Sequence, residues 1–243
     1  MPFLSQKPIP PSERLIFALD VPGPEEARHM VQRLGPSVIF YKLGLQLFLA
    51  GGYFELIDWL RNHQKKIFVD LKIFDVPETV RLAVDRLNHR GITFATVHGN
   101  DSILAAAVEA RRDVQVLAVT ALTSLDRFDL KQLGFQCEPE ELVLSRARRA
   151  LELGCDGVVS SGLEVARLRA ETGSGLTVVT PGIRPVANRD DQKRTVDVTQ
   201  AFLNGADYIV VGRPIRDASD PRTKAEEIQA SIRALFPRAD SPV

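Results

Sequence analysis

The sequence predicts a single-domain (β/α)8 barrel, also called a TIM barrel, and three observations lead to this fold class. Eight short apolar segments alternate with eight longer amphipathic segments along 243 residues. The apolar segments lack polar alternation, which is typical of parallel strands covered on both faces. Glycines such as Gly35, Gly91 and Gly154 stand where predicted helices end, and glycine is preferred there. Strands and helices in this order and number favour a closed barrel.

A doubly wound open sheet is the alternative fold, because it also alternates strands with helices. That fold commonly carries a GxGxxG turn after its first strand, where glycines let the backbone approach a dinucleotide. The first predicted strand here is followed by VPGPEE, which lacks this pattern. The closed barrel is therefore favoured.

The elements can be placed along the chain from the apolar pattern and the turn residues. The predicted strands occupy residues 15–20, 37–42, 66–72, 92–98, 114–120, 157–160, 176–180 and 208–212. The predicted helices occupy residues 24–34, 45–62, 76–90, 102–111, 139–153, 163–171, 196–204 and 224–235.

We expect residues 1–243 to form one domain, with a loose N-terminal arm over about residues 1–13 and a frayed tail over about residues 238–243. Two predicted loops are long, at residues 120–133 and 180–194. Long loops at the carboxyl ends of barrel strands commonly carry function. The second loop has no apolar anchor after Val186, and we expect it to open and close.

Composition excludes several classes of partner. The formal net charge is zero, so nothing favours nucleic acid or an anionic membrane surface. No apolar run approaches the roughly 20 residues that span a bilayer, and the N-terminus lacks the features of a secretory signal. Cys137 and Cys155 have no metal-binding spacing and are expected to be reduced thiols. We expect a cytoplasmic protein.

The third predicted strand carries charges within an apolar run, in the segment KIFVDLKIFDVPET. Asp70 and Lys72 lie two residues apart, so both side chains point to the same face of the strand. Asp75 follows just before the helix that begins near Pro77. Charges in such a place are costly unless they pair or take part in chemistry. A buried structural ion pair is the simpler interpretation of this strand alone.

Polar residues also end the other predicted strands, and in a barrel the carboxyl ends of all strands meet at one mouth. Asp20 ends the first strand and Lys42 the second. Together with the charges of the third strand they could alternate in sign, which favours their ionised forms. A structural ion pair would not require three strands to contribute, so this pattern favours a catalytic site. His98 ends the fourth strand, where it is expected to be a core or rim histidine.

The last two strands are followed by residues that suit an anion. Strand seven continues into PGIR, which contains Gly182 and Arg184, and strand eight continues into Gly212 and Arg213. Glycine lets backbone N–H groups approach a phosphate, and an arginine can hold it with two hydrogen bonds. Barrels of this kind commonly bind phosphate after strands seven and eight.

These motifs together resemble the orotidine 5′-phosphate decarboxylase family. The segments IFALD, FYKLG, VDLKIFDVPETV, TPGIRP with DDQKR, and VGRPI occur in the family's order and span nearly the whole predicted barrel. The resemblance implies a homodimer with active sites at the interface and no metal or cofactor. It implies conversion of orotidine 5′-monophosphate to uridine 5′-monophosphate and carbon dioxide, in pyrimidine biosynthesis.

The resemblance also implies roles for individual residues. It implies that Lys42, Asp70 and Lys72 are the catalytic charges, with Lys72 protonating a carbanion at C6 of the pyrimidine. It further implies that Asp75 and Thr79 reach the neighbouring site of the dimer, Asp75 as a fourth catalytic charge.

Substrate contacts are implied for a further set of residues. Asp20 would contact the ribose, and Thr123 or the adjacent Ser124 the pyrimidine. The residues implied to bind or approach the phosphate are Gly182, Arg184, Gln192, Gly212 and Arg213.

Two other functions remain open at this point. A sugar-phosphate decarboxylase or isomerase of the same barrel group, acting for example on 3-keto-gulonate 6-phosphate, would share the DxKxxD strand but use magnesium. Such a site needs an extra carboxylate, and Lys42 stands at the end of strand two instead. A catalytically silent nucleotide-binding barrel would not need Lys42, Asp70, Lys72 and Asp75 together. Metal dependence tests the first alternative, and turnover tests the second.

Overall fold

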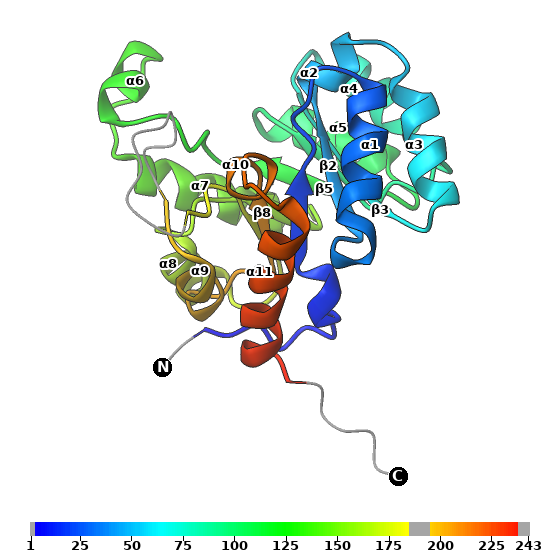
Figure 1. Ribbon diagram of the computed structural model, residues 1–243. Coiled ribbons are helices and arrows are strands. Elements are labelled where there is room, and N and C mark those ends of the chain that lie inside the picture. Colours follow the sequence, from blue (N-terminus) through cyan, green and yellow to red (C-terminus); the bar gives the residue numbers. More distant parts are fainter. Residues whose placement is uncertain (1–2, 185–194, 238–243) are drawn as a thin grey trace.

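The computed structural model describes residues 3–184 and 195–237, and eight parallel strands in sequence order form a closed barrel (Figure 1). Each strand pairs with the next, and the eighth pairs with the first. The strands are β1 (Leu15–Ala18), β2 (Phe40–Gly44), β3 (Lys66–Ile73), β4 (Phe94–Val97), β5 (Gln115–Val119), β6 (Gly157–Val159), β7 (Thr177–Thr180) and β8 (Tyr208–Val211). The predicted fold class is confirmed.

Helices connect successive strands and surround the barrel (Figure 1). The α-helices are α1 (Pro24–Leu34), α2 (Leu45–Leu49), α3 (Tyr53–Asn62), α4 (Pro77–Asp85), α5 (Asp101–Ala110), α6 (Arg127–Gln132), α7 (Pro139–Glu152), α8 (Val165–Thr172), α9 (Val198–Leu203), α10 (Arg213–Arg216) and α11 (Pro221–Leu235). Two short 3-10 turns are η1 (Pro11–Glu13) and η2 (Gly35–Ser37).

The core has two layers because successive strand residues point to opposite faces. One layer fills the barrel interior and includes aromatic side chains from β2, β3, β4 and β8. The Phe94 ring centroid lies 5.3 Å from that of Phe40, 5.8 Å from that of Phe68 and 5.2 Å from that of Tyr208. The other layer lies between the strands and the helices and holds most of the buried aliphatic residues. The aromatic interior closes the barrel below its carboxyl-terminal mouth.

The single helix predicted over residues 45–62 is wrong, because the structure divides it into α2 and α3. Gly51 and Gly52 separate the two helices with φ angles of 84° and 66°. This left-handed backbone is accessible to glycine but does not continue a right-handed helix. The glycine pair was therefore the signal for the break.

The long loop predicted over residues 120–133 contains the short helix α6, which stands away from the barrel in Figure 1. The carboxylate of Asp126 accepts hydrogen bonds from the backbone N–H groups of Phe128 and Asp129, at 2.9 and 3.1 Å. The Asp129 side chain accepts in return from the Asp126 N–H. This reciprocal capping box begins the helix. Helix α10, directly after β8, is also absent from the predicted elements.

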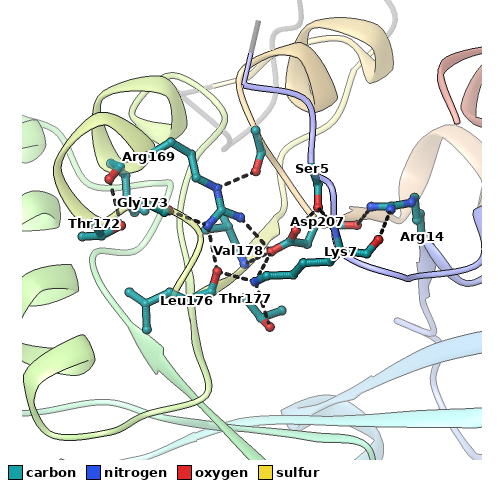
Figure 2. Close-up of polar contacts among 12 residues, drawn as sticks. Ser5, Lys7, Arg14, Arg169, Thr172, Gly173, Leu176, Thr177, Val178 and Asp207 are labelled. Atoms are coloured by element: carbon teal, nitrogen blue, oxygen red, sulfur yellow. Dashed lines mark hydrogen bonds and ion pairs between the residues drawn. The ribbon is translucent and has the colours of Figure 1, made fainter.

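The N-terminal arm is not loose over its described residues, because it is held at the amino-terminal end of the barrel. Phe3 N–H donates to the carbonyl of Leu203 at 2.9 Å. Ser5 and Lys7 both donate to the buried carboxylate of Asp207, which Figure 2 shows at the centre of a polar network. Arg169 completes the ion pairs of Asp207, with Nη2 at 2.7 Å. The tail predicted over residues 238–243 lies outside the described residues.

Candidate active site

The polar residues of the site lie directly next to the aromatic layer of the barrel interior, on the side of the carboxyl-terminal mouth. Each of the three phenylalanines in β2, β3 and β4 points inward, and the residue two positions later points inward as well. Those residues are Lys42, Asp70 and Thr96. Strand alternation therefore carries three polar side chains to the mouth, where a hydrophobic side chain would otherwise continue the core.

Four charged side chains form a continuous chain of alternating sign across the mouth. Lys42 Nζ lies 3.4 Å from Asp20 Oδ1 and 3.2 Å from Asp70 Oδ2. Lys72 Nζ lies 2.9 Å from the same Oδ2 of Asp70. The order is therefore Asp20–Lys42–Asp70–Lys72, with one carboxylate oxygen shared by two ammonium groups. Within one protomer, the alternating network predicted from the strand ends consists of these four residues.

The backbone of β3 is irregular where it carries these charges. Val69 pairs with Ala95 and Ile73 pairs with Val97, so three residues of β3 stand opposite one residue of β4. Lys72 adopts a φ of 49°, in the left-handed region that residues other than glycine rarely occupy. Such strain persists where surrounding contacts hold it, and it is common at functional sites. The irregularity turns Lys72 back towards Asp70 and the mouth.

Asp70 stays ionised despite its burial. Burial opposes the charged form, but Lys42 and Lys72, together with hydrogen bonds from Lys72 and Thr96, lower the pKa of Asp70 to about 2. The pKa of Lys42 is raised. Burial alone would lower it, but the nearby carboxylates of Asp70 and Asp20 outweigh the effect of burial. Near neutral pH, Asp70 and Lys42 therefore form an ion pair at the centre of the charged network.

This lowered pKa predicts how acid affects stability. The ordinary pKa is 3.8, so ionised Asp70 stabilises the fold above about pH 4, and the stabilisation is lost as the pH falls through about 2. The shift corresponds to about 2 kcal/mol. We expect the unfolding free energy, measured with urea, to be lower at pH 2 than at pH 5. This fall should be about 2 kcal/mol smaller in Asp70→Asn than in the wild type. An equal fall in both proteins would contradict the ion-pair description.

A cavity of about 400 Å³ opens above the charges. All four charges line it, as do six of the substrate-binding residues predicted from the sequence: Thr123, Ser124, Gly182, Arg184, Gly212 and Arg213. The structure thus brings together residues that lie in β2 and β3 with residues that follow β1, β5, β7 and β8. A cavity of this size suits a small molecule.

The side of the cavity after β7 and β8 is basic and has an open backbone. Gly182 has a φ of 76°, which favours glycine. A Cβ atom on Gly212 would lie 3.3 Å from the Cβ atom of Ala18, so glycine keeps this wall open. Arg184, Arg213 and Arg216 line the same cavity. An anionic group of the ligand would be attracted to this side, which adjoins the Asp20 end of the lysine–aspartate chain.

Two predicted site residues within the described part of the chain do not line this cavity. Asp75 and Thr79 are exposed and do not line it, and the Asp75 carboxylate accepts a hydrogen bond from the N–H of Val76 at 2.7 Å. Their predicted action on a neighbouring site stays a prediction. Gln192, and residues 185–194 of the loop expected to open and close, lie outside the described residues.

His98 lies beside the site without joining it. It is half-buried, its ring centroid lies 5.5 Å from that of Phe74, and its Nδ1 atom is buried without a hydrogen-bond partner among the described residues. Burial, together with the nearby charges of Arg146 and Lys72, lowers its pKa. A neutral imidazole packed against a ring agrees with the rim histidine predicted from the sequence.

No group of three or more His, Cys, Asp and Glu side chains that could hold a metal ion occurs within residues 3–184 and 195–237. Over the same residues, none of the helices combines the length and apolar character that a membrane crossing requires. Cys137 is half-buried and Cys155 is buried, and neither forms a disulfide.

Two residues at the site were not predicted from the sequence. Thr96 donates a hydrogen bond to Asp70, and its position two residues before His98 on one strand was the available signal. Arg216 lines the cavity and donates to the backbone carbonyl of Asp20 at 2.9 Å. It lies three residues after Arg213, but only the helical turn of α10 brings it back to the mouth.

The closed barrel and its charged mouth define a (β/α)8-barrel enzyme, because active sites of this fold lie at the carboxyl ends of the strands. Residues 13–228 match the family described as "Orotidine 5'-phosphate decarboxylase / HUMPS family". The chain belongs to this family, and it is a carboxy-lyase.

Individual relatives match over nearly their full length. A protein of Methylococcus capsulatus named orotidine 5′-phosphate decarboxylase is 64% identical over 236 residues, which cover 96% of this chain and 98% of the relative. One of the same name from Stenotrophomonas maltophilia is 49% identical over 234 residues, covering 94% and 97%. The crystal structure of orotidine 5′-phosphate decarboxylase from Lactobacillus acidophilus superposes with a TM-score of 0.80 at 36% identity, covering 90% of this chain and 99% of that one.

Proposed function

We propose that the protein decarboxylates orotidine 5′-monophosphate to uridine 5′-monophosphate, a reaction of pyrimidine biosynthesis. The observation that carries the proposal is the Asp20–Lys42–Asp70–Lys72 chain facing a cavity that Arg184, Arg213 and Arg216 also line. Family membership supports the same substrate. The nucleotide has a carboxylated pyrimidine at one end and a phosphate at the other, which suits a cavity with two differently charged sides.

Lys72 is proposed to stabilise and then protonate the carbanion. When the bond between C6 and the carboxylate breaks, carbon dioxide leaves and the electron pair stays on C6. A cation held beside C6 stabilises that charge as it develops, and a proton from the ammonium group then completes uridine 5′-monophosphate. Lys72 is the terminal member of the charged chain, and its side chain is partly exposed to the cavity.

Asp70 and Lys42 are proposed to keep this cation in place. Asp70 is ionised and pairs with both lysines through one oxygen, so it holds the Lys72 ammonium group in place and raises the pKa of Lys42. Lys42 is in turn paired with Asp20, at the position proposed for the ribose contact. The alternating charges are already arranged before the substrate binds, which reduces the reorganisation needed during the reaction.

The phosphate is proposed to bind on the basic side, near Gly182, Gly212, Arg184 and Arg213. This group lies away from the reacting carbon. Binding of the phosphate can therefore position the pyrimidine against the charged residues, and the binding energy can contribute to the chemical step. Thr123 or Ser124, which both line the cavity after β5, is proposed to contact the pyrimidine.

The experiment that tests this function is a turnover assay with purified protein and orotidine 5′-monophosphate in EDTA. Loss of the substrate's absorbance with formation of uridine 5′-monophosphate is expected. If the folded protein gives no conversion in EDTA or with added magnesium, the proposed function is wrong. If conversion requires magnesium, the proposed metal-free mechanism is wrong. The cytoplasmic location expected from the sequence stays a prediction.

A homodimer is proposed because exposed apolar side chains surround Asp75. Phe74 is 67% exposed and Val76 is 62% exposed, on either side of this aspartate. Leu45 and Leu49 are also exposed and belong to α2, which follows the neighbouring strand β2. A second copy that covered these side chains would bury apolar surface. Asp75 and Thr79 are proposed to complete the neighbouring site.

Mixing two inactive variants tests this arrangement. In a dimer of Lys72→Ala with Asp75→Asn, one site would carry both substitutions and the other neither. Random exchange of subunits is therefore expected to restore about a quarter of wild-type activity. Lys72→Ala mixed with Asp70→Ala is the control, because each chain then damages its own site and no intact site forms. Equal activity in the two mixtures would contradict the proposed role of Asp75.

A further inference from the structure

Thr96 occupies the centre of the irregular region between β3 and β4. It is fully buried, and its hydroxyl donates to Asp70 Oδ1 at 2.9 Å. The backbone N–H of Lys72 donates to the same hydroxyl oxygen at 2.9 Å. The Thr96 side chain therefore contacts both the carboxylate of Asp70 and the backbone of Lys72.

The directions of these two bonds are fixed by chemistry. A backbone N–H can only donate, so the Thr96 oxygen must accept from Lys72. The hydroxyl proton is then available for Asp70, which as a carboxylate can only accept. A threonine in this arrangement favours the ionised form of Asp70 and discriminates against the protonated acid.

Thr96 also replaces part of the strand ladder. Regular pairing between β3 and β4 stops at Val69 with Ala95 and resumes at Ile73 with Val97. Within this interval the Lys72 N–H bonds to the Thr96 hydroxyl, at the residue whose φ is 49°. A buried N–H without an acceptor is costly, so this bond stabilises the strained backbone that directs Lys72.

We propose that Thr96 is a positioning residue for the decarboxylation reaction, acting on Lys72 through its backbone and on Asp70 through its carboxylate. This inference rests on the catalytic roles proposed above for Lys72 and Asp70. Thr96 does not line the cavity, so its effect is indirect. The groups that face Asp70 are Lys42 from β2, Lys72 from β3 and Thr96 from β4. Of these three, Thr96 alone is uncharged.

The test compares Thr96→Val with Thr96→Ser. Valine has nearly the shape of threonine but neither bond, while serine keeps the hydroxyl. We expect kcat on orotidine 5′-monophosphate to fall about 10- to 100-fold in Thr96→Val, since hydrogen bonds to charged groups have effects of this size. Thr96→Ser is expected to stay within about threefold of the wild type. The dissociation constant of uridine 5′-monophosphate should change less than about twofold in either variant, since Thr96 lies outside the cavity.

Two results would overturn the proposal. One is a Thr96→Val enzyme with kcat within about threefold of the wild type. The other is a Thr96→Ser enzyme as slow as Thr96→Val, which would assign the effect to the lost methyl group and its packing. If Thr96→Val does not fold, Thr96→Cys replaces it, because a thiol is only a weak donor and acceptor. Its kcat should then be lower than that of Thr96→Ser, and equal values would contradict the proposal. A wild-type enzyme without turnover would instead refute the proposed function.

Discussion

Lys72→Ala is expected to lower kcat by about 10³-fold or more while the protein remains folded. The substitution removes both the cation beside the developing carbanion and the proposed proton donor, and each effect alone is commonly worth a factor of 10² or more. Removing Lys72 leaves Asp70 paired with Lys42, at 3.2 Å, so the buried carboxylate keeps one cation. The prediction is checked by steady-state kinetics together with thermal unfolding.

Lys224→Ala is the matched control for this substitution. Lys224 is paired with Glu227 on the surface of α11, and its loss is expected to leave kcat unchanged. Lys72→Arg separates two parts of the effect, because arginine keeps the charge but does not release a proton near neutral pH. Turnover by Lys72→Ala close to that of the wild type would show that Lys72 is not the proton donor.

Asp207→Ala is expected to destabilise the protein more than any surface substitution. Asp207 is fully buried at the amino-terminal end of the barrel, where its Oδ2 accepts from Lys7, Arg169 and the N–H of Val178 at 2.9, 2.7 and 2.8 Å (Figure 2). Removing the carboxylate leaves the buried guanidinium of Arg169 without its ion-pair partner. Breaking such a pair costs about 3–5 kcal/mol. This corresponds to a fall of about 10 °C in Tm for a chain of this size.

Asp58→Ala provides the control for Asp207→Ala. Asp58 pairs with Arg61 on the exposed surface of α3, at 3.3 Å, and such pairs contribute about 0–1 kcal/mol. Urea unfolding of both variants measures the difference directly. A change in Asp207→Ala no larger than that in Asp58→Ala would contradict the assignment of this network as a stabilising link between the N-terminal segment and the barrel.

The barrel could be predicted because its signals are local. Each strand is an apolar run and each helix has a polar face, so the alternation is visible in the sequence. The break between α2 and α3 was missed because the apolar pattern continues across Gly51 and Gly52, although backbone geometry does not. The ordered arm was missed because Ser5 and Lys7 bind Asp207, which lies some 200 residues away. No local pattern identifies such a partner.

The candidate site was predictable to the extent that strand ends determine it. Asp20, Lys42, Asp70 and Lys72 follow from the rule that the carboxyl ends of barrel strands share one mouth. Thr96 did not follow, because a threonine within an apolar strand is ordinary. Its importance depends on the irregular pairing of β3 with β4, which only the three-dimensional arrangement reveals. The roles of Asp75 and Thr79 depend on a second copy of the chain and stay predictions.

Protonation of C6 by Lys72 can be tested directly by running the last step in reverse. Uridine 5′-monophosphate is incubated with the enzyme in alkaline D2O, and the H6 signal is followed by proton NMR. If Lys72 delivers the proton in the forward direction, it also removes H6 in the reverse direction, and deuterium then replaces that proton. We expect the wild type to exchange H6 and Lys72→Ala not to exchange it. Exchange by Lys72→Ala at the wild-type rate would contradict it.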